Sequence, residues 1–339
     1  MGVDLSDLVT ATPRTLEDLR GRSIAIDAFN TLYQFLSIIR QPDGTPLMDH
    51  QGRVTSHLSG IIYRTTNLLA VGIQPAYVFD GRPPTLKART VEARGEVKRK
   101  AQREWQDALE KGDLARARTK AMQTSRLTGE MVGQSKRLLE LLGVPWVQAP
   151  SEGEAQAAHM ARRGDAWAAA SQDYDAFLFG APVLVRNLAL SGKRKLPRKD
   201  VYVDVVPEQL QLDATLAVLG VTREQLVDIG ILIGTDFNEG IRGIGPKKAL
   251  ALVQAHGSLD GALRSIGADV EGSERIREIF LRPEVSDAYE LAWREPDVEG
   301  VTRMLVEEHD FSQERIDGAL GKVLEARKKT GQKSLDRWS

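Results

Sequence analysis

Short apolar segments, each about the length of a buried strand, alternate with helical patterns along much of the 339-residue chain. Strands of this kind are predicted at residues 23–28, 75–80, 144–149, 166–171 and 201–205. The helical patterns among them cover residues 54–70, 85–110, 130–142 and 152–163. Strands that alternate with helices favour an α/β fold, in which helices cover both faces of a mostly parallel central sheet.

Residues 82–130 interrupt this alternation, because they are long, charged and poor in large apolar side chains. We interpret them as an inserted helical excursion rather than as part of the core. Further along, residues 223–233 are predicted to form an apolar-faced helix, and residues 270–326 are predicted to be helical. The last helix carries an apolar stripe at helical spacing, formed by Ile316, Leu320, Val323 and Leu324.

The residue types that are absent narrow the chemistry. The chain has no Cys, which excludes disulfides, zinc–thiolate sites, iron–sulfur clusters and a cysteine nucleophile. Its five His residues lack the spacing of metal ligands, so a histidine metal site is not expected. No run approaches the ~18 apolar residues of a membrane span, and the N-terminus has no secretory pattern. We therefore expect a globular cytoplasmic protein.

Positive charge is concentrated locally, although the formal net charge is only −1. Residues 82–120 contain twelve Lys and Arg against six Asp and Glu, and residues 186–199 contain six Lys and Arg and no acid. Basic segments in a neutral chain suit a surface that binds nucleic acid. A solvated helix face remains the simpler explanation of any single charge run.

Acidic residues recur where the predicted strands end. Two acids close the first two strands, two pairs follow the next two, and one more follows the helix predicted at 223–233. In chain order they are Asp27, Asp80, Glu152, Glu154, Asp173, Asp175 and Asp236. Because the carboxyl ends of parallel strands lie along one edge of a sheet, we expect these side chains to converge there.

Such a cluster requires something to neutralise it. Two carboxylates ~4 Å apart repel by on the order of 4 kcal/mol at an effective dielectric constant of 20. Oxygen ligands without His or Cys favour Mg²⁺ or Mn²⁺. Two such ions ~3.5–4 Å apart can clamp both oxygens of a phosphodiester that is being cleaved.

Each acid also has a structural explanation when it is taken alone. Asp27 and Asp80 suit turns, and Ser151 with Glu154 matches a helix-capping box. Glu152 suits the positive end of a helix dipole, and the two acids after the fourth strand suit a polar loop. Their joint placement after successive strands favours the metal interpretation.

Residues 243–248 predict a helix start that binds an anion. Pro246 suits the first helical position, which makes Gly245 the N-cap. The free backbone N–H groups of that helix end, with Lys247 and Lys248 beside them, suit a phosphate. Contacts of this kind hold a duplex without reading its sequence. A plain turn between two helices is the alternative.

Taken together, these motifs resemble the flap endonuclease family over nearly the whole chain. The segments that carry the resemblance are Met1-Gly-Val, Ile26-Asp-Ala, Val78-Phe-Asp-Gly-Arg-Pro-Pro, Ala149-Pro-Ser-Glu-Gly-Glu-Ala-Gln-Ala, Ser171-Gln-Asp-Tyr-Asp, Gly234-Thr-Asp-Phe and Ile241-Arg-Gly-Ile-Gly-Pro-Lys-Lys-Ala. The resemblance implies a PIN-like 5′ nuclease core over residues 1–260. Within it, 82–130 would be a helical arch and 223–257 a helix–two-turn–helix motif that binds DNA. A helical region at 261–326 and a tail at 327–339 would follow.

The resemblance also implies roles for individual residues. The seven acids would hold two Mg²⁺ ions, with Mn²⁺ as an alternative. Lys87 and Arg94 match the family's catalytic basic pair, and their spacing of about two helical turns would point both the same way; two solvated helix residues are the alternative. Contacts with DNA fall on Gly2, Tyr33, Gly243, Gly245, Lys247 and Lys248. A buried core tyrosine is the alternative for Tyr33, and the helix–two-turn–helix would also hold K⁺.

The C-terminal tail resembles a peptide that binds a sliding clamp of the PCNA type. Gln332 would make polar contacts, while Leu335 and Trp338 would fill a pocket from one face of a short turn. The family pattern ends in two aromatic residues, whereas this chain has Ser339 at the second. A tail that matches by chance is the alternative. The chain lacks the long basic extension of nuclear relatives, which indicates the archaeal type.

The function predicted from the sequence is therefore a Mg²⁺-dependent 5′ flap endonuclease with 5′-3′ exonuclease activity. It would act as a monomer on branched DNA, in Okazaki fragment maturation and repair. One rival is a 5′-3′ exonuclease, or a gap- or bubble-cutting repair nuclease, on the same core. The other rival is a scaffold that binds DNA and the clamp without catalysis; the complete set of seven acids speaks against it.

Overall fold

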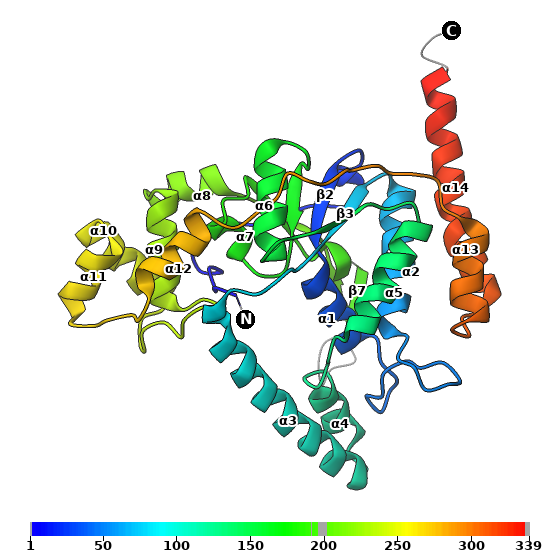
Figure 1. Ribbon diagram of the computed structural model, residues 1–339, viewed down its shortest axis with the longest axis horizontal. Coiled ribbons are helices and arrows are strands. Elements are labelled where there is room, and N and C mark those ends of the chain that lie inside the picture. The colour runs from blue at the N-terminus through cyan, green and yellow to red at the C-terminus, as the bar shows by residue number, and fades with distance from the viewer. Residues whose placement is uncertain (1, 191, 196–201, 336–339) are drawn as a thin grey trace.

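The central element of the fold is a mixed β-sheet, as the computed structural model of residues 2–190, 192–195 and 202–335 shows (Figure 1). Seven strands of the described chain form it, in the order β1-β9-β6-β5-β2-β3-β4. Its parallel part consists of β2 (Ser23–Asp27), β3 (Gln74–Phe79), β4 (Trp146–Gln148), β5 (Ala168–Ala170) and β6 (Val183–Arg186). The antiparallel edge consists of β9 (Glu208–Gln211) and β1 (Thr12–Pro13). The predicted mostly parallel sheet is confirmed.

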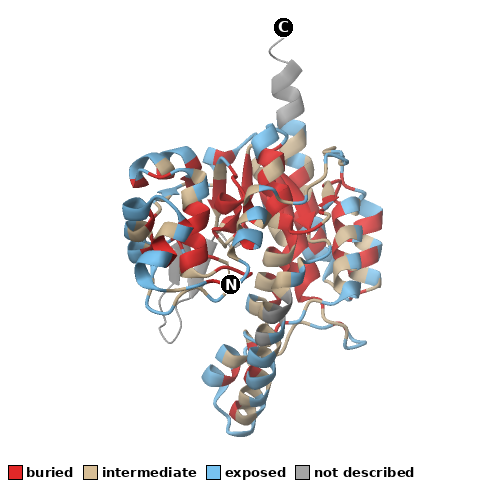
Figure 2. Ribbon diagram, turned by 60° about the vertical axis from the view of Figure 1, so that its left-hand side comes forward, coloured by how far each residue is buried: buried red, intermediate tan, exposed pale blue. Residues whose placement is uncertain are grey.

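Alternate side chains of the parallel strands enter two separate hydrophobic cores. Ala25 points into the core that contains α6 (Gly153–Arg163), α7 (Asp175–Leu178), α9 (Arg223–Ile233), α10 (Pro246–His256), α11 (Leu259–Ile266) and α12 (Ser273–Leu281). Its neighbours Ile24 and Ile26 point into the other core, with α1 (Ala28–Ile38), α2 (Ser56–Val71), α5 (Gly129–Leu141) and α14 (Gln313–Leu335). This alternation holds the strands between two helical layers, and Figure 2 shows the central strands as buried.

A helical projection extends from the body of the molecule between β3 and α5 (Figure 1). It consists of the short 3₁₀ turn η2 (Thr85–Lys87) and of the helices α3 (Ala88–Glu110) and α4 (Leu114–Ala121). The two helices meet through small buried side chains, namely Ala101, Ala108, Ala117 and Ala121. A contact made of alanines buries little apolar area, so few core interactions hold the projection in place.

Two sequence predictions about regular structure are wrong in detail. The strand predicted at 201–205 lies outside the central sheet, because β8 (Tyr202–Val205) pairs only with β7 (Gly192–Lys195) in an antiparallel hairpin. The central sheet instead gains β1, β6 and β9, which were not predicted. Residues 282–297 are not helical. Their polar groups bond to other elements, as when Trp293 Nε1 donates to the carbonyl of Pro75 at 2.7 Å.

The remaining elements complete the two layers. They are η1 (Glu17–Leu19), η3 (Leu188–Leu190), α8 (Leu212–Leu219), α13 (Val298–Thr302) and the π-helical turn η4 (Arg303–Glu307). The apolar stripe predicted for the last helix is buried at Ile316, Leu320 and Val323 and half-buried at Leu324. In the part of the chain that is described, no helix combines the length and the apolarity that crossing a bilayer requires.

Phe280 of α12 is expected to be critical for the stability of the first core. Its ring lies 4.8 Å from Phe179 and 5.4 Å from Phe237, between centroids, and it is fully buried. Phe280→Ala should lower the free energy of unfolding by about 3–5 kcal/mol, because it removes buried area and leaves a cavity. Urea unfolding followed by circular dichroism measures this. The control Val218→Ala, at a side chain that is 79% exposed, should change it by less than ~0.5 kcal/mol; equal effects would contradict the prediction.

Candidate metal centre

The acids predicted to converge are brought together at the carboxyl edge of the parallel strands. Asp27 is the last residue of β2, and its Oδ1 accepts a hydrogen bond from the backbone N–H of Asn30 at 3.0 Å. Asp80 follows β3, and its Oδ1 accepts from the N–H of Gly153 at 2.7 Å. Because β2 and β3 are parallel neighbours in register, these two acids lie side by side at one edge.

The pKa values of Asp27 and Asp80 show how closely the acids approach one another. Burial raises the pKa of Asp27 well above its usual range, and repulsion from Asp80 and Asp173 adds to this. Burial likewise raises the pKa of Asp80 to about 6, with Glu152 and Asp236 as repelling neighbours. Carboxyl groups at the ends of different strands therefore share one electrostatic environment.

The second half of the cluster shows the same effect. Burial raises the pKa of Glu154 well above its usual range, and Asp175, Asp27 and Asp173 repel its charge. Burial raises the pKa of Asp175 to about 7, with repulsion from Asp236 and Asp173. All seven predicted acids thus belong to one cluster, which we call the carboxylate cluster.

Two basic residues at the start of the projection point into the carboxylate cluster. Lys87 Nζ lies 2.5 Å from Glu152 Oε2 and 3.5 Å from Asp236 Oδ2. Arg94 donates to Asp236 Oδ1 at 2.5 Å, and Thr90 between them donates its hydroxyl to the carbonyl of Asp236 at 2.8 Å. The Lys87 side chain is only 13% exposed, which is unlike a solvated helix residue.

These ion pairs reverse the effect of burial on two pKa values. Burial alone would raise the pKa of Asp236, but Arg94 and Lys87 outweigh it and lower that pKa. Burial would also lower the pKa of Lys87, but Glu152, Asp236 and Asp80 raise it above its usual range. One side of the cluster is therefore neutralised by the protein, while the side around Glu154 and Asp175 is not.

The capping box considered for Ser151 and Glu154 is wrong. The N-cap of α6 is Glu152, whose own side chain makes no capping hydrogen bond, and the first N–H of the helix, that of Gly153, donates to Asp80 instead. Ser151 instead donates its hydroxyl to the carbonyl of Arg82 at 3.2 Å. Glu154 is half-buried as a residue, but its Oε1 atom is buried and has no hydrogen-bond partner within the described residues. A buried carboxylate oxygen without a partner is costly, so capping does not explain this acid.

The carboxylate cluster contains the type of ligand atom that a divalent cation prefers, but its side chains are not yet positioned around a cation. No three acidic or His side chains of the described chain are already arranged as a metal site. Lys87 and Arg94 occupy the acids on one side, so their contacts must loosen before a cation binds there. Seven oxygen donors, repulsion among them and the unpartnered Glu154 Oε1 nevertheless suit Mg²⁺ or Mn²⁺. The ion pairs of Lys87 and Arg94 involve flexible side chains, which can rearrange when a cation binds.

The start of the chain forms part of the carboxylate cluster. The backbone N–H of Val3 donates to Asp175 Oδ1 at 2.6 Å. A Cβ atom on Gly2 would lie 2.7 Å from Asp175 Oδ1 and 2.9 Å from Asp173 Cβ. Only glycine therefore fits at position 2 without displacing these acids.

The aromatic ring of Tyr33 lies between the core and the projection. Tyr33 is half-buried on α1, and the Lys98 ammonium of α3 lies 4.5 Å from its ring centroid. The ring is thus covered by a cation rather than enclosed in the apolar core. Lys98, like Asn30 and Thr90, was not predicted from the sequence.

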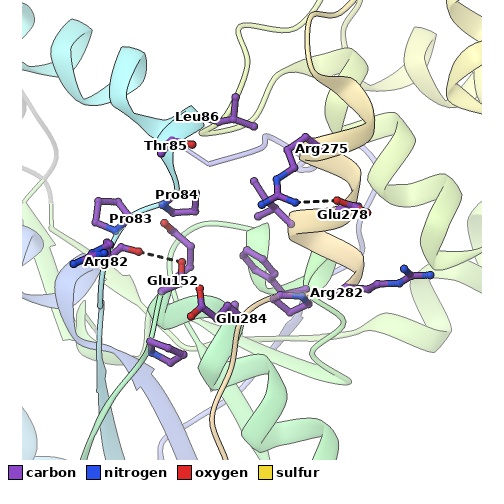
Figure 3. Close-up of a pocket in the computed structure, with 16 residues that line it drawn as sticks. Arg82, Pro83, Pro84, Thr85, Leu86, Glu152, Arg275, Glu278, Arg282 and Glu284 are labelled. Carbon is purple, nitrogen blue, oxygen red and sulfur yellow. Dashed lines mark hydrogen bonds and ion pairs between the residues drawn. The ribbon is translucent and has the colours of Figure 1, made fainter.

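A cavity of about 670 Å³ opens next to Glu152, between residues 82–86 and α12 (Figure 3). Arg275 and Glu278 form an ion pair on its α12 side at 3.1 Å. Of the seven acids, only Glu152 lines this cavity. It is therefore an open space beside the carboxylate cluster rather than the cluster itself.

The turn predicted to bind an anion has the expected backbone. Gly243 has a φ of +83°, Gly245 is the N-cap of α10, and Pro246 occupies the first turn of that helix. Lys247 and Lys248 are exposed, at 3.5 Å from Asp7 and 3.2 Å from the carbonyl of Gly243. No side chain caps this helix end, so its first N–H groups are available to a ligand.

The predicted clamp-binding residues cannot be placed in the same way. Gln332 and Leu335 belong to α14, but their side chains lie outside what the structure describes. Trp338 lies outside the described residues altogether.

The raised pKa of Asp175 predicts a pH dependence of stability in the metal-free protein. This carboxyl group has a pKa of about 7 in the folded protein and of ~3.9 in the unfolded chain. Its contribution to the free energy of unfolding is fully present below pH ~3.9. That contribution is lost as the pH rises through the pKa of the folded state. Between pH 6.5 and 8 in EDTA, the free energy of unfolding of the wild type should therefore fall relative to Asp175→Asn. We expect a fall of up to about 1 kcal/mol.

Urea unfolding of both proteins at the two pH values measures this difference. The buried His57, whose pKa is lowered to about 4, contributes equally to both proteins and cancels. Saturating Mg²⁺ should reverse the trend, because cations compete with protons for the same oxygens. A difference between the two proteins that stays constant with pH in EDTA would contradict the prediction.

Comparison with known proteins identifies the family. Models of the XPG N-terminal domain and the XPG I-region match residues 2–102 and 143–236. Flap endonuclease 1 of Staphylothermus marinus is 53% identical over 349 residues, covering 100% of this chain and 99% of that protein. Flap endonuclease 1 of Thermofilum pendens is 55% identical over 344 residues, with the same two coverages. The solved structure of flap endonuclease-1 from Methanococcus jannaschii, 41% identical with a TM-score of 0.77, covers 97% of this chain and 100% of that chain. The chain belongs to the flap endonuclease family.

Proposed function

We propose that this protein is a metal-dependent 5′ flap endonuclease with 5′-3′ exonuclease activity, acting in DNA replication and repair. The observation that carries the proposal is the carboxylate cluster with Lys87 and Arg94 set against it. This combination of oxygen ligands and cations is what hydrolysis of a phosphodiester requires. The full-length similarity to proteins named flap endonuclease 1 supports the same reaction.

The seven acids are proposed as the ligands of two Mg²⁺ ions, some of them through water, with Mn²⁺ as a substitute. The chemistry that Mg²⁺ supplies when bound is Lewis-acid activation of the phosphate and of the attacking water. The protein's own part is to hold Asp27 and Asp80 in place through backbone hydrogen bonds, and to bury the Oε1 atom of Glu154. Their raised pKa values mean that cations and protons compete for these oxygens.

Lys87 and Arg94 are proposed as the catalytic basic pair. In the absence of substrate they neutralise Glu152 and Asp236. When a phosphodiester enters, these two side chains would donate hydrogen bonds to its oxygens and stabilise the negative charge that develops there. Their position on the first two turns of the projection puts them above the acids, which supports this role.

The DNA is proposed to contact three further parts of the chain. The N-terminal end of α10, with Gly243, Gly245, Lys247 and Lys248, would hold a duplex phosphate, and K⁺ would bind at the same motif. Tyr33 would stack on a base near the cut once Lys98 moves off its ring. Gly2 would lie close to the scissile phosphate, because it adjoins Asp173 and Asp175. Solved nucleases of the same fold, such as the catalytic core of Rad2, are in complex with DNA substrate.

The projection formed by α3 and α4 is proposed as the helical arch under which a single strand threads. Its length and positive charge, together with its small contact area, support this role. Threading favours the flap endonuclease over a bubble-cutting nuclease of the same core, because a bubble has no free end. Blocking the 5′ end of a flap would distinguish the two.

The remaining expectations from the sequence are part of the proposal. Residues 1–260 would be the nuclease core, 261–326 a helical region and 327–339 the tail that binds a PCNA-type clamp. The tail is supported only by its sequence, Gln332 to Trp338. The protein would act as a monomer in the cytoplasm. A non-catalytic scaffold is the second candidate, and it is disfavoured because the complete set of seven acids, with Lys87 and Arg94 against them, suits catalysis.

Asp173→Ala should abolish cleavage of a labelled double-flap substrate in Mg²⁺, because it removes one ligand of the metal centre. Binding of the same DNA in EDTA should be largely retained, as should thermal stability, since a buried acid that Asp236 repels is removed. Gel-based cleavage with and without chelator, and fluorescence anisotropy, measure these effects. Loss of cleavage and binding together would show that the acid is structural, and wild-type protein that binds without cutting would establish the scaffold.

Replacing Lys247 and Lys248 together by Ala should weaken binding of duplex DNA uniformly across sequences. The slope of log K against log salt should become less negative by about 1.8, if each Lys contacts one phosphate. Anisotropy titrations in EDTA at several salt concentrations measure the slope. Arg162→Ala, an exposed position at the far end of α6 from Glu152, is the matched control. Equal slopes for the double variant and the wild type would exclude the turn as a contact.

A further inference from the structure

Asn30 connects two acids of the carboxylate cluster that come from different strands. Its backbone N–H donates to Asp27 Oδ1 at 3.0 Å, and its side-chain Nδ2 donates to Asp173 Oδ2 at 3.1 Å. Asp27 ends β2, whereas Asp173 follows β5, which is the parallel neighbour of β2. A single residue of α1 therefore relates the positions of two carboxylates that are 146 residues apart in the chain.

Gln34, one turn further along α1, sets the direction of the Asn30 amide. Gln34 Nε2 donates to Asn30 Oδ1 at 2.5 Å. Turning the Asn30 amide around would place its carbonyl against the Asp173 carboxylate and its NH₂ against another NH₂. Both arrangements are repulsive, so the hydrogen-bond chain from Gln34 to Asn30 to Asp173 has only one consistent direction.

The arrangement costs stability, which argues against a purely structural role. Gln34 Oε1 is buried and has no hydrogen-bond partner within the described residues. Gln34 is among the residues that line a cavity of about 10 Å³, together with Asn30 and Ser171. A buried amide oxygen that is left unpaired costs about 1–3 kcal/mol, whereas an apolar side chain of the same shape would avoid that cost.

The neutral amide suits an acid that must remain charged. Glu152 and Asp236 are held by cations, whereas no ion pair to Asp173 occurs within the described residues. An amide donor holds the Asp173 oxygen in one position without cancelling its charge. The Asn30 amide therefore leaves the negative charge of this carboxylate for a divalent cation, although Arg94 and the backbone N–H of Gly2 also act on it, and the carboxylate does not have to be ordered when the cation binds.

We propose that Asn30 is a positioning residue, which fixes the Asp173 carboxylate for binding of the divalent cation, and that Gln34 orients it. The inference rests on the proposed function, because it assigns Asp173 to the metal centre. It extends that function to a pair of residues on α1 that touch neither the substrate nor the metal.

The test measures binding of Mn²⁺ to the full-length protein without DNA, by the electron paramagnetic resonance signal of the free ion. Asn30→Leu should raise the dissociation constant roughly tenfold, as loss of an outer hydrogen-bond partner does at other metal sites. Gln34→Met should raise it by a smaller factor, without lowering the melting temperature, because it removes the unpaired buried oxygen. The Mg²⁺ concentration that gives half-maximal flap cleavage should shift in the same order.

Thr65→Val is the matched control for the loss of a buried hydrogen bond elsewhere. Thr65 shares its hydrogen bond with the Tyr77 hydroxyl at 2.9 Å, outside the carboxylate cluster. This variant should lower the melting temperature and leave the Mn²⁺ dissociation constant unchanged. If Asn30→Leu or Gln34→Met binds Mn²⁺ as the wild type does, or if Thr65→Val weakens binding equally, the inference is overturned. If the wild type itself binds no Mn²⁺, the proposed function fails instead.

Discussion

Repulsion among buried carboxylates is the constraint on which the rest of this molecule depends. Two of them ~4 Å apart cost on the order of 4 kcal/mol at an effective dielectric constant of 20, and the cluster contains seven. The sheet withstands this because a hydrophobic core on each face holds its strands in register. Around the cluster, the chain supplies partial relief of three kinds: the cations Lys87 and Arg94, backbone N–H groups such as that of Val3, and the amide of Asn30.

Much of the fold follows from short-range patterns in the sequence. The strands β2 and β3 and the helices α6 and α9 were predicted to within one residue at each end, since each combines an apolar run with clear end signals. The strands β6 and β9 were missed, because they are only four residues long and one of them is largely polar. The non-helical course of residues 282–297 depends on bonds to elements far away in sequence, such as Trp293 to Pro75, and periodicity carries no information about these.

The candidate site, like the fold, could be predicted from the sequence only where a local pattern marks its residues. Six of the seven acids could be predicted because carboxyl ends of parallel strands meet at one edge and these acids lie at or follow such ends, whereas Asp236 follows the helix α9. The motif Ser151 to Glu154 was misleading, since its spacing of three residues matches a capping box although the N-cap of the helix is Glu152. Asn30, Thr90 and Lys98 could not be predicted, because their partners Asp173, Asp236 and Tyr33 become neighbours only in the folded chain.

The hydrogen bond from Val3 to Asp175 joins the beginning of the chain to a residue 172 positions later, and Arg94 reaches Asp236 across 142 positions. Contacts of such sequence separation close large loops and form slowly. During synthesis, the cluster therefore cannot form until residues near the N-terminus can contact residues that leave the ribosome much later. In an incompletely synthesised chain the acids are far apart and do not repel one another strongly. The repulsion arises only when the chain folds, at which point the two hydrophobic cores offset it.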